Sequence, residues 1–428
     1  MANSENMPTT GHDNVAGLLT LNNLSYSLPN DLSVSISRTG TTQFFQTKGG
    51  APGQNLICIL NTGSAYIDPK RSYLRLDLTN TGTSAMSFGG GTACNLFDRS
   101  VISTRDGSVL ERIDNLNVLS RVRQYYEHGI EYNHSVLSAA GGRFGGTTEA
   151  NTDPAFLQPG DSARFIIPMS MVSPLFDSKQ LFPNSLASGL RIDLQLASAN
   201  RAFQKSTTDV STTPLNYQIT DCAIVCESYQ LSDLVLRTLN QISSSSGLEY
   251  VYNTWFNTSG KRASSSINIE SRKAVSRALS CFYVETAMDS ATEYKVDSFK
   301  AIPPAAVDIQ ARVGSLYLPT QSSLRAPTSA MLAPELYSHA LMAFEKYRDA
   351  KGSSAVSMRE FNDGSSIFAS SLERDTIGGA GIPLSNSRIL SVDGTFNAPL
   401  PGEIFAIGLF LKYTSLCRIY LSNIVLET

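Results

Sequence analysis

The residues best suited to chemistry in this 428-residue chain are its four histidines, at positions 12, 128, 134 and 339. Imidazole binds metals and acts as a general base near neutral pH. A metal centre needs several such ligands converging with a carboxylate, and the chain has no His-x-His pair. His128 and His339 fall in segments that we expect to be helical. We therefore predict no metal site and no cofactor.

The sequence contains no motif that would place a catalytic nucleophile as a hydrolase requires. The chain has no G-x-S-x-G elbow. The run Asn61-Thr62-Gly63-Ser64 is similar to an aspartic protease loop, but Asn61 stands where the catalytic Asp must be and no second copy exists. Carboxylate pairs such as Asp193 with Glu227 leave a glycosidase formally open. We expect no catalytic residue and a protein that is not an enzyme.

The six cysteines are expected to be buried, reduced thiols. The first thirty residues have no basic start and no long apolar core, so neither a secretory signal nor a membrane-spanning helix is expected. Disulfides are uncommon in chains that are not exported. The cysteines lie mostly inside apolar stretches, at positions 58, 94, 222, 226, 281 and 417.

The charge composition excludes a chain-wide polycation that coats nucleic acid. Lys and Arg number 34 against 37 Asp and Glu, and only 17% of residues are charged. The first basic residue is Arg38, so no basic arm precedes it. Basic pairs at Lys70-Arg71, Arg121 with Arg123 and Lys261-Arg262 are expected to be ordinary solvated surface. None of the Gly-rich loops FGGGT, GGRFGG and GGAGIP continues into the G-K-[ST] of a phosphate loop.

Alternating apolar and polar residues dominate the sequence and predict antiparallel sheets buried on one side. In YLRLDLT (73–79) Leu74, Leu76 and Leu78 share one face, and LRIDLQL (190–196) repeats the pattern. Further strands are expected at 55–60, 165–169, 219–226, 278–284, 309–318, 367–371, 404–411 and 417–426.

Three helices are expected among these strands. One follows Asp114 as N-cap and stops at Gly129. Another begins at Pro334, with proline in the first turn, and ends near Gly352. A weaker helix over 232–242 connects the two halves of the chain.

The order of elements repeats along the chain, which indicates a duplicated unit of roughly 200 residues. Gly corners at Gly107 and Gly314 are 207 residues apart, helix starts at Asp114 and Pro334 are 220 apart, and the closing Glu227 and Glu427 are 200 apart. The proline-containing segments PMSMVSPLFDSKQLFP and FNAPLPGEIF are matched in the same way. We predict an all-β chain of two consecutive eight-stranded jelly rolls with a few short loop helices. The expected divisions are an N-terminal arm (1–35), a first jelly roll (36–243) and a second (244–428), with the boundary at the tetraserine 243–246 that follows the connecting helix.

Taken in order, several segments resemble the double jelly-roll major capsid proteins of icosahedral viruses. The resemblance is strongest to the capsid proteins of small eukaryotic DNA viruses of the polinton-like, adintovirus and virophage type. The segments that carry this resemblance are YIDPKRSYLRLDL (66–78), 94–126, 165–197, 217–233, ARVGSLYLPTQSS (311–323) and SSIFASSLERD (365–375).

The resemblance implies a capsid building block in the virion, assembled inside the host cell. Three chains with two similar domains each would form a pseudo-hexameric capsomer. Implied partners are other copies of the chain, penton and minor capsid proteins and a membrane beneath the shell, without sequence-specific nucleic-acid binding. Loops over 139–153 and 206–216 are expected at the outer surface or at capsomer edges. The alternative is a carbohydrate-binding jelly-roll protein, such as an attachment protein or lectin, for which the single Trp255 is the available aromatic platform.

Overall fold

The computed structural model describes most of the chain from Ser35 onward. The predicted N-terminal arm lies outside the described residues except for Ser35. The described residues are 35–88, 91–142, 157–178, 180–205, 215–287, 308–318, 324, 333–345, 356–361, 366–375, 380–395, 405–420 and 424–427.

The first half forms two facing antiparallel sheets. One sheet has the order β1 (Ser35–Phe44), β10 (Tyr217–Leu231), β3 (Tyr66–Asn80), β7 (Ser162–Pro168). The other has the order β2 (Asn55–Ile59), β8 (Arg191–Leu196), β5 (Phe97–Ser103), β6 (Val109–Asp114). A short extra pair joins β4 (Met86–Ser87) to β9 (Gln204–Lys205).

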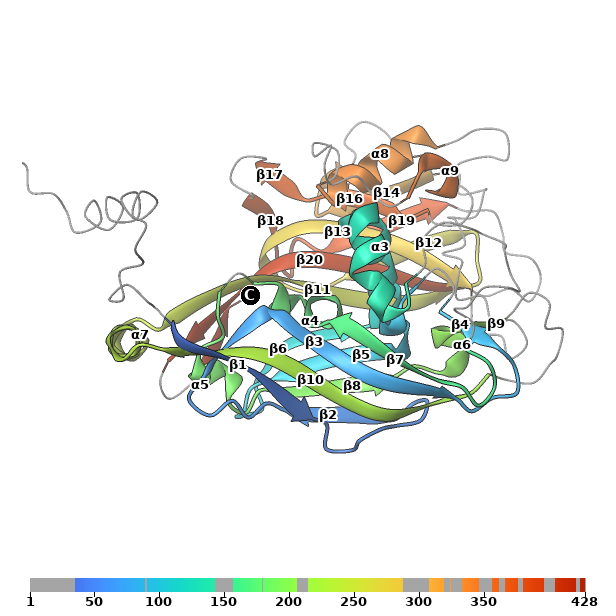
Figure 1. Ribbon diagram of the computed structural model, residues 1–428. Coiled ribbons are helices and arrows are strands. Elements are labelled where there is room, and N and C mark those ends of the chain that lie inside the picture. The colour runs from blue at the N-terminus through green and yellow to red at the C-terminus, as the bar shows by residue number, and fades with distance from the viewer. Residues whose placement is uncertain are drawn as a thin grey trace, which may run out of the picture.

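The second half repeats this order strand for strand. Its larger sheet runs β11 (Leu248–Arg262), β20 (Phe405–Ile419), β13 (Val275–Ala287), β18 (Ala380–Leu384), β17 (Glu373–Asp375), with β16 (Phe368–Ser371) on β13 and β21 (Ile424–Glu427) on β20. Its smaller sheet runs β12 (Ser266–Ser271), β19 (Leu390–Thr395), β14 (Asp308–Val313), β15 (Leu316–Leu318). Each of the eight strands of the first roll thus has a counterpart, and the predicted pair of jelly rolls is confirmed. Figure 1 shows the second roll stacked on the first, with β11 at the boundary.

Burial follows the predicted alternation. On β3, Leu74, Leu76 and Leu78 are buried between the two sheets, whereas Arg75 and Asp77 lie on the outer face. On β8, Ile192 and Leu194 point to the same interior. The hydrophobic free energy of these inward rows holds the sheets together.

The two Gly corners occupy equivalent turns. Gly107 (φ +85°) connects β5 to β6, and Gly314 (φ +61°) connects β14 to β15. Both have the left-handed backbone that glycine adopts without strain. Two other predicted correspondences are wrong. Glu427 lies on β21, which has no counterpart in the first roll, and FNAPLPGEIF falls between β19 and β20 whereas its proposed partner lies between β7 and β8.

The helices lie mainly in the connections between strands. In the first half they are η2 (Ala93–Leu96), α2 (Leu116–Val122), η3 (Arg123–Glu127), α3 (Ile130–Ser135), η4 (Leu137–Ala140), α4 (Met169–Val172), η5 (Pro174–Asp177), α5 (Asn184–Ala187) and α6 (Ala199–Ala202). They are followed by α7 (Asp233–Ser245), α8 (Pro334–Ala343) and α9 (Met358–Glu360). Within the described residues no helix is both long and apolar enough to cross a membrane.

Three predicted helix boundaries differ from the structure. Asp114 ends β6, and the N-cap is Asn115, whose φ of +51° turns the chain from strand to helix. The helix from Pro334 ends at Ala343, well before Gly352, because Phe344 leaves the helix to join an aromatic cluster and Glu345 adopts a φ of +60°. Gly129 is the N-cap of α3, and the preceding helix stops at Glu127.

The connecting helix is confirmed as α7, which begins one residue later and ends three residues later than predicted. The tetraserine does not follow this helix, because Ser243–Ser245 form its last turn and Ser246 is its C-cap. The Ser244 and Ser245 hydroxyls donate to the carbonyl of Gln241. The predicted strand 417–426 is split between the end of β20 and β21. The loops expected at the outer surface fall largely outside the described residues.

Candidate functional site

The three histidines that the structure describes do not converge. The ring of His128 stacks on Tyr132 with centroids 4.4 Å apart, and His134 lies on α3. His339 lies on α8, where burial lowers its pKa. His12 falls outside the described residues. No group of three or more His, Cys, Asp or Glu side chains in the described part of the chain is placed to hold a metal ion.

The carboxylates singled out from the sequence belong to different sheets. Asp193 lies on β8 and accepts from Arg191 at 3.0 Å, whereas Glu227 lies on β10 and accepts from Arg71 at 3.3 Å. They do not form the facing pair that a glycosidase uses. Asn61 follows β2, and its backbone carbonyl accepts a hydrogen bond from Gln43 at 3.0 Å.

The junction between the rolls is where buried polar side chains meet. Strand β11 is the edge strand of the larger second-roll sheet, and first-roll elements cover it. The hydroxyl of Tyr250 donates to the Leu175 carbonyl at 3.2 Å, and that of Tyr252 donates to the Leu110 carbonyl at 2.8 Å. An exposed edge strand invites pairing with other chains, so the first roll protects this one.

Glu111 is the first charged group at the junction. Its side chain, on β6, is only 3% exposed and accepts hydrogen bonds from Thr254 of β11 at 2.5 Å and from Ser173. Burial raises the pKa of Glu111 to about 7, against the lowering effect of these two hydroxyls and of the Arg123 charge. The carboxyl therefore changes charge near neutral pH inside the contact between the rolls.

A buried ion network lies beside it. Arg123 on η3 pairs with Glu127 one turn later, and its guanidinium also donates to the Ser170 carbonyl at 2.7 Å. Lys412 on β20 of the second roll reaches Glu127 at 3.0 Å. Burial alone would raise the pKa of Glu127, but the Arg123 and Lys412 charges together hold it well below its ordinary value. The network joins the two rolls through charge.

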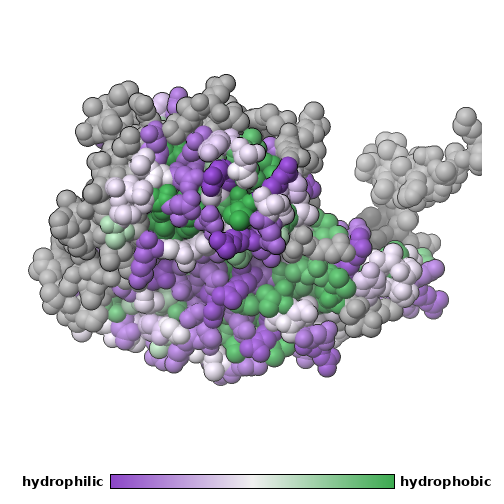
Figure 2. All heavy atoms as spheres, turned by 180° about the vertical axis from the view of Figure 1, so that it is seen from behind, coloured by the Kyte–Doolittle hydropathy of each residue, from purple (hydrophilic) through white to green (hydrophobic). Residues whose placement is uncertain are grey.

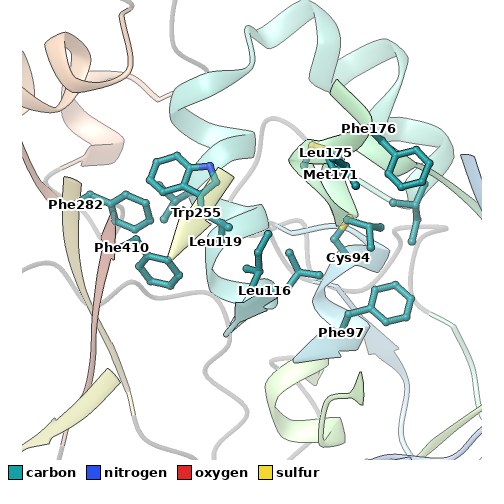
Figure 3. Packing of buried hydrophobic residues seen from close by; sticks show 14 of the residues in the cluster. Cys94, Phe97, Leu116, Leu119, Met171, Leu175, Phe176, Trp255, Phe282 and Phe410 are labelled. Carbon is teal, nitrogen blue, oxygen red and sulfur yellow. The ribbon is translucent and has the colours of Figure 1, made fainter. Parts of the chain in front are cut away.

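An aromatic cluster completes the junction. Trp255 of β11 is 2% exposed, stacks on Phe344 with centroids 6.1 Å apart and meets Phe282 edge-on at 5.3 Å. Phe344 in turn stacks on Tyr126 of the first roll at 5.6 Å. Figure 3 shows Trp255 between Phe282 and Leu119 of α2. Because Trp255 is enclosed, it offers no platform on which a sugar could stack.

The outer face of the larger first-roll sheet carries paired charges. Arg164 on β7 forks onto Asp77 of β3 at 2.6 and 2.7 Å, and Arg75 reaches Asp221 of β10 at 3.2 Å. Glu227 accepts from both Arg38 of β1 and Arg71. These cross-strand pairs neutralise the face locally, which leaves little net charge to attract a polyanion.

Two of the basic residues expected at the surface are buried instead. Arg121 and Arg123 lie inside the helical connection between β6 and β7, whereas Lys70 lies outside it, 3.8 Å from Asp177. The available sequence signal was the i, i+4 spacing of Arg123 and Glu127, which pairs charges on one side of a helix. Nothing in the sequence around Glu111 or Trp255 marks them as junction residues.

All six cysteines are buried with free thiols, as expected. Burial raises the pKa of Cys58 and of Cys94 to about 12, so neither thiol ionises near neutral pH.

Comparison with known proteins agrees with this architecture. No family model matches the sequence, and no curated protein matches it. The structure is similar to a chain of the PBCV-1 virus capsid, with a TM-score of 0.58 and 11% identity over 94% of this chain and 99% of that one. It is also similar to the mavirus major capsid protein, with a TM-score of 0.56 and 12% identity over 100% of this chain and 96% of that one. The Faustovirus major capsid protein gives a TM-score of 0.59 and 7% identity over 94% of each chain. The chain has the double jelly-roll fold.

Proposed function

We propose that this chain is the major capsid protein of an icosahedral virus, a structural component of the virion and not an enzyme. The observation that carries the proposal is the repeated strand order, which places two equivalent jelly rolls in one chain. The same arrangement, over nearly the full length of both chains, is found in the solved capsid proteins described above.

Two similar rolls per chain suit a trimer. Three copies present six similar units around a three-fold axis, so the capsomer has a pseudo-hexameric outline that tiles a hexagonal lattice. The junction supports this role because hydrogen bonds, charges and aromatic rings fix the two rolls relative to each other. Loose rolls would not give a tile of constant shape.

The division of the chain and its partners follow from the same proposal. We assign the residues before Ser35 to an arm, start the first roll with β1 at Ser35 and the second roll with β11 at Leu248, and take α7 (Asp233–Ser245) as the connection, so the predicted boundary at 243/244 falls inside this helix. The principal partners are further copies of the chain, first within the trimer and then between capsomers. Penton and minor capsid proteins and a membrane beneath the shell complete the assembly, and the chain does not bind nucleic acid by sequence.

Light scattering at several concentrations tests the proposal. The expected result is a mass near three times 46.2 kDa, or closed particles of uniform size that electron microscopy can image. A monomer of 46.2 kDa at every concentration would contradict it. A glycan array would then test the carbohydrate-binding alternative, against which the enclosed position of Trp255 already argues.

A further inference from the structure

Helix α7, which connects the two rolls, has no fully buried apolar side chain. It carries five aliphatic residues, yet Ser243 is its only buried residue. Leu234 is 75% exposed and Ile242 is 39% exposed. A helix in a folded protein normally buries an apolar stripe against its neighbours. Figure 1 shows α7 projecting from the edge of the molecule, so the described residues do not supply that neighbour.

The surface beside α7 is also apolar. The helix is anchored at its C-terminal end by the Ser243 hydroxyl, which donates to the Ile419 carbonyl of β20 at 3.2 Å. By strand register, Val251 of β11 and Val425 of β21 lie on one face of β20 near this point, and they are 49% and 39% exposed. In Figure 2 hydrophobic side chains gather on the side of the body toward α7. Helix and sheet end together offer an apolar surface.

The N-terminal segment leaves the fold at the same place. Ser35, the first residue of β1, pairs with Leu231 of β10, and the N-cap of α7 is Ser232. Paired strands are about 4.8 Å apart, so the chain before Ser35 starts beside the first turn of α7.

The sequence of that segment suits an apolar surface. Residues 14–30 contain no charged side chain. Its larger aliphatic members are Val15, Leu18, Leu19, Leu21, Leu24 and Leu28. From Ser35 the seven residues back to Leu28 can span about 24 Å, and the 13 residues of α7 extend about 20 Å. A short tether of this kind also gives an effective concentration in the millimolar range.

We propose that residues 14–30 pack onto α7 of their own chain and cover its exposed stripe, which runs through Leu234, Thr238 and Ile242 at i, i+4 and i+8. The proposal is independent of the capsid assignment, because it concerns contacts within one chain. A second copy and a lipid surface are the competing occupants, and both are less favoured because neither is tethered at the helix.

Disulfide trapping tests the contact in the full-length chain. Cysteine is placed at Leu18, Leu21 or Leu24 in separate variants, each combined with Thr238→Cys in the exposed stripe. The matched control is Asn240→Cys, which is exposed on the same helix but points away from the stripe, since two residues turn a helix by about 200°. The six native thiols are buried and give a low background.

The expected result is a disulfide within one chain that forms at least tenfold faster with Thr238→Cys than with Asn240→Cys for one or more of the three positions. Equal rates at both helix positions would overturn the proposal. So would disulfides that link two chains only, since these would assign the surface to a second copy.

Hydrogen exchange gives a second measurement that needs no new bond. Replacing Leu18, Leu21 and Leu24 with serine should speed exchange of the α7 amides by at least tenfold, whereas Asn22→Ser with Asn23→Ser should leave it unchanged. Unchanged exchange in the leucine variant would overturn the proposal. Protection that appears only when phosphatidylcholine vesicles are added would overturn it too, in favour of a lipid surface.

Discussion

The two rolls share one strand order but differ in how completely each builds its own core. The first roll encloses rows of leucine and isoleucine between its sheets, and its helices α2 and η3 lie against the second roll. The second roll contributes Trp255, Phe282 and Phe344 to the aromatic cluster at the junction, where Phe344 stacks on Tyr126 of the first roll. Its edge strand β11 is covered by the first roll. Equal topology therefore does not mean equal stability, and we infer that the second roll depends on the first.

The largest effect is expected from Trp255→Ala. Removing this side chain leaves a cavity between Phe282, Phe344 and Leu119, and the free energy of unfolding should fall by about 4 kcal/mol. Circular dichroism during urea unfolding measures this free energy. In the variant we expect a separate early transition in which the second roll unfolds. Tyr317→Ala on β15, a half-exposed site, is the control and should change stability by less than about 0.5 kcal/mol. A loss below about 1 kcal/mol in Trp255→Ala would show that the rolls do not depend on this contact.

A smaller effect is expected from pH acting on Glu111. Its pKa rises from 4.5 in the unfolded chain to about 7 in the fold. The folded state therefore holds the proton more tightly, and its contribution to stability is complete below pH 4.5 and is lost as pH rises toward 7. Roughly 3 kcal/mol is the upper size of this change, since one pKa unit corresponds to about 1.4 kcal/mol.

Urea unfolding of the wild type and of Glu111→Gln at pH 5 and pH 7 measures this contribution. The glutamine variant should show a smaller loss between the two pH values, because it cannot ionise at the junction. Asp114→Asn, at the exposed end of the same strand, is the control and should keep the wild-type dependence. Parallel pH profiles for wild type and Glu111→Gln would remove the carboxyl as the cause.

The smallest effect is expected on the outer face of the first roll. Arg164→Ala removes the bidentate ion pair with Asp77. In the wild type, Arg164 holds the pKa of Asp77 below its ordinary value. Exposed ion pairs are screened by water and salt, so the urea midpoint should move within experimental error. A shift as large as that of Trp255→Ala would mean that the outer charges, and not the junction, distinguish the two rolls.

The repeated order of strands was predictable because its signals are local. Period-two alternation identified β3 and β8, and glycine marked the turns at Gly107 and Gly314 where the backbone needs a positive φ. Pro334 marked the start of α8, because proline is favoured in the first turn of a helix.

The junction was not predictable because it depends on contacts between residues far apart in sequence. Phe344 ends α8 early through its contact with Tyr126, more than 200 residues away. Glu111 and Arg121 are buried by packing against other elements, which no pattern in their own segments records. Trp255 was considered for sugar binding from its residue type alone, and its neighbours come from three different elements.

The unequal distribution of buried cysteines between the two rolls allows the unfolding of each roll to be followed separately. Cys58, Cys94, Cys222 and Cys226 lie in the first roll, and Cys281 and Cys417 lie in the second. A thiol reagent added in mild denaturant modifies only what has opened, and intact mass spectrometry counts the adducts on each molecule. Molecules carrying two adducts would have lost the second roll alone, and molecules carrying six would have lost both. The order in which the two rolls unfold can therefore be determined from the number of adducts on each molecule of the unmodified wild-type chain.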